Sequence, residues 1–217
     1  MKKFIFSLLA AATLAAPALA QDKLTLTPLK EMPAGVYQLD PTHASLTWQV
    51  KHLGLSNYTA RFAKFDATLD FNPTALAQSQ VTATIDPTSI RTDYPNAATK
   101  DFDAELAHGA PWFNAKQFPE IKFVSTQLVL QDGHTGRLTG DLTLLGVTKP
   151  VTLTVRFNGG LANAPFSKKP TLGFSASGSL KRTEWGFNHL VPLVGETVNL
   201  NIEAEFIHAG TPTPAQP

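Results

Sequence analysis

The sequence contains no cysteine among its 217 residues. Disulfide bridges, thiol catalysis and cysteine-based zinc sites are therefore excluded, so stability must come from one sizeable hydrophobic core. Charged residues make up only 16% of the chain and form no basic stripe, which argues against a nucleic-acid partner. No apolar run beyond the N-terminus approaches the ~20 residues of a membrane helix, so we expect no membrane-spanning segment.

The N-terminal segment has the features of a secretory signal peptide. Lys2 and Lys3 form a basic start, an apolar stretch follows to Ala16, and Ala18-Leu19-Ala20 provides a small-residue cleavage motif. Cleavage removes two lysines and no acid, which changes the formal net charge from +1 to −1. We expect residues 1–20 to be removed and the mature protein to be periplasmic or secreted, with a retained signal anchor as the alternative.

Alternating apolar and polar residues dominate the remaining chain. In TVNLNIEAEFIH, residues 197–208, every second side chain is apolar, which is typical of a strand with one buried face and one wet face. Similar alternation marks the segments 43–52, 64–72, 79–86, 120–131, 137–145, 151–157 and 171–181. The pattern predicts one all-β domain of about eight antiparallel strands over residues 36–208, between an irregular lead-in at 21–35 and a disordered tail at 209–217.

One segment departs from the strand pattern. In NAATKDFDAELAHG, residues 96–109, the apolar side chains of Ala98, Phe102 and Leu106 are spaced four residues apart. Gly109 stands where a helix commonly ends. We predict a single short α-helix here, of about two to three turns, that covers an opening or an edge of the sheet.

Alternation alone fits either a β-barrel or a β-sandwich. Two observations favour a barrel. Several runs reach about ten residues, which is longer than the ~5–6 residues of a typical strand. In addition, Gly140, Gly173 and Gly178 lie inside strand patterns, as they do where closed sheets bend.

The inward face combines large and small side chains. The large ones include Leu46, Trp48, Val50, Phe65 and Phe174, and the small ones are Ala44, Ala67, Ala83, Gly140, Ala176, Gly178 and Ala204. An eight-stranded barrel is just wide enough either to be filled by its side chains or to hold one small ligand. Alternation by itself leaves both outcomes open.

Recognisable catalytic and metal-binding motifs are missing. The chain has no G-x-S-x-G, no H-x-H, no H-E-x-x-H and no cluster of Asp and His in the sequence, so we predict neither a catalytic residue nor a metal site. His52 ends an apolar strand face near Trp48 and is interpreted as part of a cavity lining. Arg182 is expected to brace a loop through hydrogen bonds, with contact to an anionic head group as the alternative reading.

Several stretches together resemble the YceI-like family. VYQLDPTHASLTWQVKHLG resembles the family's opening strand pair, and it is followed in order by RFAKFDATLDF, FPEIKFVSTQL, GDLTLLGVTKPVTL, LKRTEWGFN and LVGETVNLNIEAEF. The resemblance spans residues 36–208 and implies an antiparallel, eight-stranded, lipocalin-like barrel with one short helix. It also implies a polyisoprenoid or similar long-chain amphiphile in the lumen, and a possible homodimer. Ala44, Trp112 and Asn114 depart from the residues most common in the family, which leaves the identity of the ligand open.

The predicted ligand contacts lie on the inward face or at the barrel rim: Leu46, Trp48, Val50, His52, Arg61, Phe65, Phe102, Phe123 and Phe174. Arg61 is included because it follows the polar stretch GLSNY, where a guanidinium could bind a phosphate. We predict an exported module, without a cofactor, that holds a polyisoprenoid, an isoprenoid quinone or a related amphiphile for transport, storage or stress response. The alternatives are an enzyme for a hydrophobic substrate, with His52 or His189 as base, and a packed-barrel interaction protein.

Overall fold

A computed structural model describes residues 24–210, so the predicted signal peptide and the segment from residue 211 lie outside the described residues. Eleven strands form one antiparallel sheet: β1 (Gly35–Leu39), β2 (Ser45–His52), β3 (Ser56–Phe62), β4 (Phe65–Phe71), β5 (Gln80–Ile85), β6 (Ile90–Arg91), β7 (Ile121–Leu130), β8 (Thr135–Leu144), β9 (Val147–Leu161), β10 (Thr171–Lys181) and β11 (Val194–Gly210). Within the described residues there is one α-helix, α1, which spans Phe102–His108. Short 3-10 turns are η1 (Leu29–Glu31), η2 (Pro41–His43), η3 (Leu76–Gln78), η4 (Pro87–Ser89) and η5 (Arg182–Trp185).

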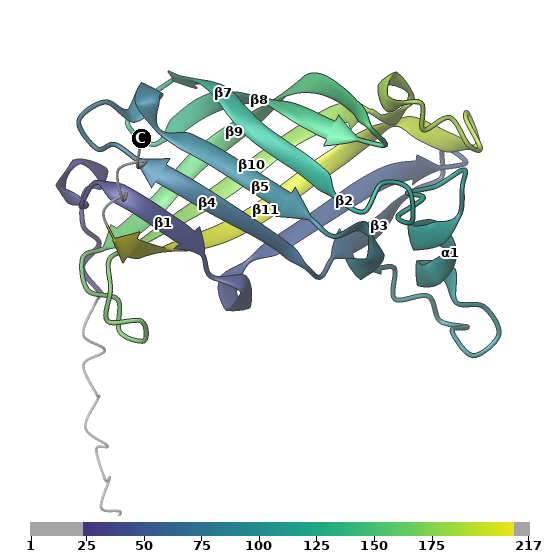
Figure 1. Cartoon of the computed structure of the whole chain (residues 1–217), viewed down its shortest axis with the longest axis horizontal. Helices are drawn as coiled ribbons and strands as arrows, with labels where there is room; N and C mark the ends of the chain where they lie inside the picture. The colour runs from purple at the N-terminus through teal and green to yellow at the C-terminus, as the bar shows by residue number, and fades with distance from the viewer. Residues whose placement is uncertain (1–23, 211–217) are drawn as a thin grey trace, which may run out of the picture.

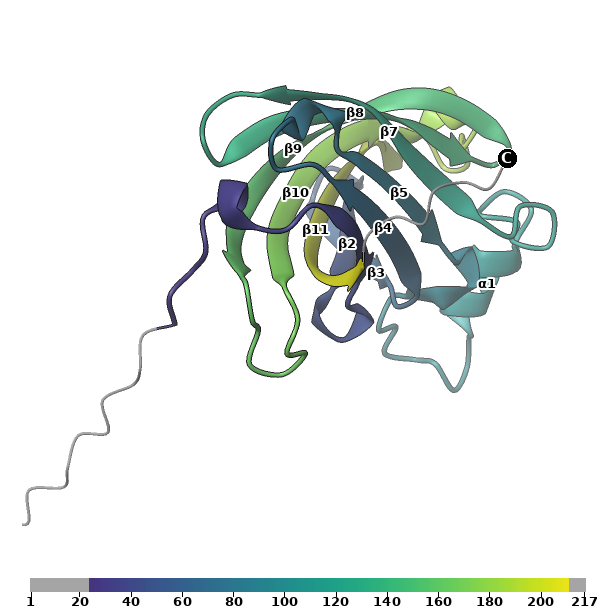
Figure 2. The ribbon, with the colours of Figure 1, turned by 60° about the vertical axis from the view of Figure 1, so that its left-hand side comes forward.

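The sheet closes on itself, which confirms the predicted antiparallel barrel. Its strand order β1-β4-β5-β7-β8-β9-β10-β11 is completed by pairing of β11 with β1, giving a ring of eight strands. Figure 1 shows the long strands running obliquely along the barrel, and Figure 2 shows them curving around its interior. β11 is long enough to pair with β1 near Phe206 and with β2 between Val194 and Glu203.

Three pairs of consecutive strands lengthen one side of the barrel. β1 and β2 are separated by η2, β5 and β6 by η4, and β3 and β4 by two residues. Strands β2, β3 and β6 lie outside the eight-stranded ring and continue the sheet from β11 in the order β2-β3-β6. This extension would leave β6 as an open edge.

Helix α1 covers that edge, as the sequence pattern predicted. Leu106 and Ala107 of the helix are buried with Phe62 and Ile90 in one core cluster. The Asp103 carboxylate also accepts hydrogen bonds from the backbone N–H and the hydroxyl of Thr92, at 2.9 and 2.6 Å, and so ties the helix to the end of β6. Figure 1 shows α1 at the right-hand end of the barrel.

The helix begins later than the apolar spacing suggested. Asp101 accepts a hydrogen bond from the backbone N–H of Ala104 and therefore acts as the N-cap, which leaves Ala98 outside. Gly109 follows the helix, with extended rather than left-handed backbone (φ −60°, ψ 131°). A Cβ at this position would lie 2.7 Å from the Trp112 ring, so the glycine permits a close approach of that ring.

Two segments differ from the predicted element boundaries. Residues 56–62 form strand β3, whereas the sequence analysis placed a polar turn before Arg61, because Ser56, Asn57 and Thr59 show little apolar alternation. The lead-in is partly ordered, since Met32 is only 1% exposed and Thr27 bridges to Gly160 of β9. The folded unit therefore begins before residue 36.

The buried side chains form two clusters rather than one continuous core. One cluster includes Leu106, Trp185 and buried side chains of β7, β8 and the first part of β9, and the other includes Met32, Tyr37 and Leu172. Between residues 24 and 210, none of the helices is both long and apolar enough for a transmembrane span.

Candidate functional site

The barrel encloses a cavity of about 550 Å³. This volume falls within the ~300–1,000 Å³ of pockets that hold small ligands. Side chains of both core clusters border the cavity, among them Leu142 and Leu153 from one and Leu39 and Phe206 from the other. The lining is almost entirely apolar, which suits a hydrocarbon chain better than a polar metabolite.

Small inward side chains keep this space open. Ala67, Ala83, Ala176 and Ala204 line the cavity on four different strands. On β11, the inward Leu200 remains partly exposed although its strand is paired on both sides. These residues border a space that the side chains of residues 24–210 do not fill. The lumen is therefore hollow, which is one of the two outcomes that the sequence left open.

The cavity opens at one end of the barrel. Of its lining residues, those that are exposed are Lys30, Leu130, Asp132, Gly133 and His134. They belong to η1 and to the end of β7 with the turn that leads into β8. These residues define the cavity mouth, and the turns that carry them lie toward the left in Figure 1, at the end of the barrel opposite α1.

The opposite end of the cavity is closed by aromatic side chains and by Arg182. Trp112, Phe113 and Phe187 border the cavity there, and Phe113 contacts Phe62 and Phe187 at ring-centroid distances of 5.4 and 5.3 Å. Arg182 is 2% exposed, and burial lowers the pKa of its guanidinium. It donates hydrogen bonds to the carbonyls of Phe187, Val194 and Gly195.

These three contacts, at 2.7, 2.8 and 2.8 Å, occupy Nη1, Nη2 and Nε of the guanidinium. The interpretation of Arg182 as a loop brace is thus supported. These donors bind the backbone of the connection between η5 and β11 and of the first two residues of β11. These bonds use three of the five guanidinium N–H groups and hold the side chain in a fixed position.

Six of the nine predicted contact residues line the cavity: Leu46, Trp48, Val50, Phe65, Phe123 and Phe174. The indole Nε1 of Trp48 is buried and, within residues 24–210, has no hydrogen-bond partner. The six come from β2, β4, β7 and β10, where apolar alternation correctly identified the inward face.

His52, Arg61 and Phe102 lie elsewhere. His52 is exposed at the last position of β2 and pairs with Ser56 and Val194, so the expectation that it belongs to the cavity lining is corrected. Alternation assigns the correct side of the strand but not the point at which the strand leaves the barrel. Arg61 is exposed and forms an ion pair with Asp93 at 2.8 Å.

Phe102 packs on neighbouring aromatic rings instead of the cavity. Its ring contacts Tyr94 and Tyr58 at centroid distances of 5.4 and 6.3 Å. Lys100 Nζ lies 5.0 Å from the Phe102 ring centroid. Of the helix side chains, it is Leu106 that reaches the cavity.

Sequence reasoning did not identify the residues at the cavity mouth. Lys30 lies in the lead-in, and Asp132 and His134 lie in a hairpin turn, so none of them shows strand alternation. His134 is held there by stacking on Phe157 of β9, with a centroid distance of 6.3 Å and an interplanar angle of 4°. Only the closure of the barrel brings these segments together.

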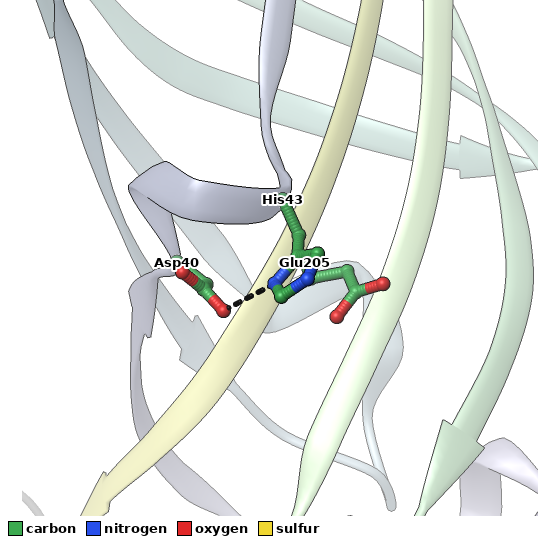
Figure 3. Close-up of side chains that lie close together, drawn as sticks. All are labelled: Asp40, His43 and Glu205. Carbon is green, nitrogen blue, oxygen red and sulfur yellow. Dashed lines mark hydrogen bonds and ion pairs between the residues drawn. The ribbon is translucent and has the colours of Figure 1, made fainter. Parts of the chain in front are cut away.

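A second cluster lies outside the cavity, where β1 passes into β2. The ligand-type atoms of Asp40, His43 and Glu205 lie within 4.8 Å of one another (Figure 3). His43 Nδ1 is 2.8 Å from Asp40 Oδ2, and this contact raises the pKa of His43 and lowers the pKa of Asp40. Asp40 also accepts a hydrogen bond from the backbone N–H of Thr42, so the pair braces η2.

One His and two carboxylates form a donor set that a divalent metal ion could use. No sequence motif predicts this set, because only the pairing of β1 with β11 brings Glu205 close to Asp40 and His43. Asp40 and His43 are three residues apart, and Glu205 comes from β11, near the other end of the chain. His189, the other candidate base, does not line the cavity and instead packs edge-on against Trp112 at 4.7 Å.

Comparison with known proteins identifies relatives along most of the chain. The family model for the YceI-like domain matches residues 37–206. Protein YceI of Escherichia coli (strain UMN026) is 34% identical over 174 residues, which cover 79% of this chain and 86% of that protein.

Solved structures share the fold. BcnA of Burkholderia cenocepacia matches with a TM-score of 0.64 and 24% identity, covering 77% of this chain and 98% of that one. A domain from Saccharophagus degradans, described as polyisoprenoid binding and implicated in plant cell wall breakdown, matches with a TM-score of 0.54 and 12% identity. That match covers 81% of this chain and 99% of the domain.

Proposed function

This chain belongs to the YceI-like domain family, and on that premise we propose that it is an exported lipid-binding protein that holds a long-chain amphiphile in its barrel. The cargo we propose is a polyisoprenoid or an isoprenoid quinone, carried for transport, storage or a stress response and without a catalytic step. The observation that carries this proposal is the apolar cavity of about 550 Å³ with one open end. The solved Saccharophagus degradans domain, described as polyisoprenoid binding, supports the class of ligand.

The binding energy of such a cargo is adequate without a charged anchor. Each buried methylene contributes about 0.8 kcal/mol, so about twenty buried carbons contribute roughly 16 kcal/mol. Association and ordering cost on the order of 8 kcal/mol. The remaining ~8 kcal/mol corresponds to a micromolar dissociation constant.

The distribution of polar groups supports one orientation of the cargo. Lys30, Asp132 and His134 stand at the cavity mouth, whereas Arg182 at the closed end is engaged by three backbone carbonyls. A polar head group is therefore better accommodated at the mouth, with the hydrocarbon chain directed toward Arg182. A long chain without a polar group would bind through the same apolar surface.

The test is an analysis of bound lipid followed by uptake measurements. The full chain is expressed with its own N-terminal segment, purified as the cell processes it, and extracted with organic solvent for mass spectrometry. The emptied protein is then titrated with geranylgeraniol and with decylubiquinone. We expect a prenyl-type amphiphile in the extract and saturable binding of at least one probe.

A matched pair of variants locates the binding. Ala176 lines the cavity, whereas its neighbour Ser177 is exposed on the outer face of β10. Ala176→Trp should fill part of the lumen and weaken uptake at least tenfold, and Ser177→Trp should bind like the parent protein. An extract without lipid, together with no uptake of either probe, would refute the proposed function.

The positions of the two candidate bases, His52 and His189, give no support to the enzyme alternative. Neither His52 nor His189 borders the cavity, so a substrate chain held there would not reach either ring. The variants His52→Ala and His189→Ala are thus expected to retain probe binding. The expectation of a homodimer, which came from the family resemblance, is checked by sedimentation analysis of the same preparations.

A further inference from the structure

The rim around the cavity mouth carries an exposed aromatic residue on a basic loop. Phe166 is 92% exposed, more than any other large apolar side chain between residues 24 and 210. It lies in the loop 162–170, between β9 and β10, which also contains Lys168 and Lys169 and no acidic residue. Figure 2 shows this green loop projecting beyond the ends of both strands.

The loop presents Phe166 on a hydrogen-bonded base. The backbone N–H of Lys168 donates to the Ala164 carbonyl at 2.9 Å, and that of Ala164 donates to the Lys169 carbonyl at 3.1 Å. Ala164 itself is buried. The exposure of Phe166 is therefore built into the geometry of the turn.

The loop and the cavity mouth lie at the same end of the barrel. Thr135 of β8 pairs with Arg156 of β9, so the remainder of β9 and the loop after it continue past the turn that borders the mouth. Leu26 packs on Gly159 of β9, and the Thr27 hydroxyl accepts a hydrogen bond from the Ala162 N–H. These contacts bring the first described residues to the same rim.

Other exposed apolar side chains continue this surface. Leu24 and Leu26 are 56% and 54% exposed, and Val129 and Leu130 at the end of β7 are 48% and 50% exposed. The segments 24–31, 131–134 and 162–170 together contain three lysines and two acids. This combination of apolar residues, an aromatic ring and lysines is typical of proteins that lie on anionic membrane surfaces.

We propose that the protein docks with its cavity mouth against an anionic phospholipid bilayer. Phe166 enters the interfacial region, and Lys168 and Lys169 contact lipid phosphates. This inference rests on the proposed function in one respect, because docking in this orientation would let an amphiphile pass between bilayer and lumen without crossing water.

A second set of exposed apolar residues, at the opposite end, provides a matched control. Leu53, Leu55 and Leu193 lie there, and the Leu53 N–H donates to the Leu193 carbonyl at 2.7 Å. Leu55 is 84% exposed. None of the exposed lining residues lies at this end, so docking here would hold the bilayer away from the opening.

The experiment measures co-sedimentation with vesicles of phosphatidylcholine containing about 30% phosphatidylglycerol, and with vesicles of phosphatidylcholine alone. We expect Phe166→Ala to weaken binding to the anionic vesicles about tenfold. The pair Lys168→Gln and Lys169→Gln should weaken it by roughly fivefold per lysine at low salt, and by less as salt is raised. Leu55→Ala should bind like the parent protein, and thermal unfolding checks that each variant is folded.

Three results would overturn the docking proposal. These are absence of vesicle binding by the parent protein, unchanged binding by Phe166→Ala, and a loss of binding confined to Leu55→Ala. Uptake of geranylgeraniol from solution is measured separately on the same preparations. Vesicle binding that depends on Phe166, without uptake of geranylgeraniol, would refute the lipid cargo and support the docking surface. Uptake of geranylgeraniol without vesicle binding would refute the docking surface and support the lipid cargo.

Discussion

Arg182 provides a direct test of how the closed end of the barrel is held. The substitution Arg182→Met keeps much of the side-chain volume but removes three hydrogen bonds to the carbonyls of Phe187, Val194 and Gly195. These carbonyls belong to the segment that precedes and begins β11. Without the guanidinium, that segment loses three of its hydrogen bonds to η5 and keeps that between the Thr183 hydroxyl and Glu196.

The expected cost follows from the number and kind of these bonds. Hydrogen bonds to a charged group contribute roughly 1.5–3 kcal/mol each. Phe187, Val194 and Gly195 are partly exposed, so water can hydrate some of the released carbonyls and reduce the loss. We therefore expect Arg182→Met to lower the free energy of unfolding by about 3–5 kcal/mol.

Urea unfolding followed by circular dichroism measures this change, with Arg156→Met as the control. Arg156 is exposed on β9, so its substitution should alter the free energy of unfolding by less than about 0.5 kcal/mol. A loss below about 1 kcal/mol for Arg182→Met would refute the structural role. Normal stability with greatly weakened binding of an anionic amphiphile would instead identify Arg182 as a head-group contact.

Four further substitutions test local features by the same unfolding assay. Trp185→Phe should cost about 2 kcal/mol because Nε1 donates to the buried Leu142 carbonyl at 3.1 Å. Trp48→Phe should cost less, because its buried Nε1 has no partner to lose; equal losses would contradict this reasoning. Gly140→Val should cost about 1–3 kcal/mol, because the new Cβ would lie 2.6 Å from the Val124 carbonyl oxygen, and no loss would contradict the tight fit. Asp40 raises the folded-state pKa of His43 above its ordinary value of 6.5. The stability difference between the parent and His43→Gln should therefore be largest below pH 6.5 and shrink as the pH rises through the folded-state pKa, and a difference that grows with pH would contradict the pairing.

Strand alternation was sufficient to predict most of the barrel wall. Residues 171–181 and 197–208 were assigned from period-two patterns and lie in β10 and β11. Two of the glycines inside strand patterns, Gly140 and Gly173, lie at register shifts of the sheet, where the strand pairing is irregular. The inward positions of Leu46, Trp48 and Phe174 followed from the same periodicity.

The ends of the barrel could not be predicted in the same way. Alternation indicates which face of a strand is apolar, but it does not indicate where the strand passes beyond the enclosed volume. His52 illustrates this limit, because it occupies an inward position in the pattern and is exposed in the structure. Lys30 and His134 border the same cavity mouth although they are far apart in the sequence, so no local pattern identifies them.

The hollow interior follows from a mismatch between strand number and side-chain size. A closed ring of eight strands has a radius that is set by its hydrogen-bonded ladder, so the walls cannot move inward when small residues such as Ala176 and Ala204 face the lumen. In a closely packed core, an empty space of 550 Å³ would cost roughly 13 kcal/mol at about 24 cal/mol per Å³. That is comparable to the whole stability of a typical domain, about 5–15 kcal/mol. The backbone ladder fixes the volume, and an apolar ligand that occupies it recovers contacts which the protein's own side chains do not make.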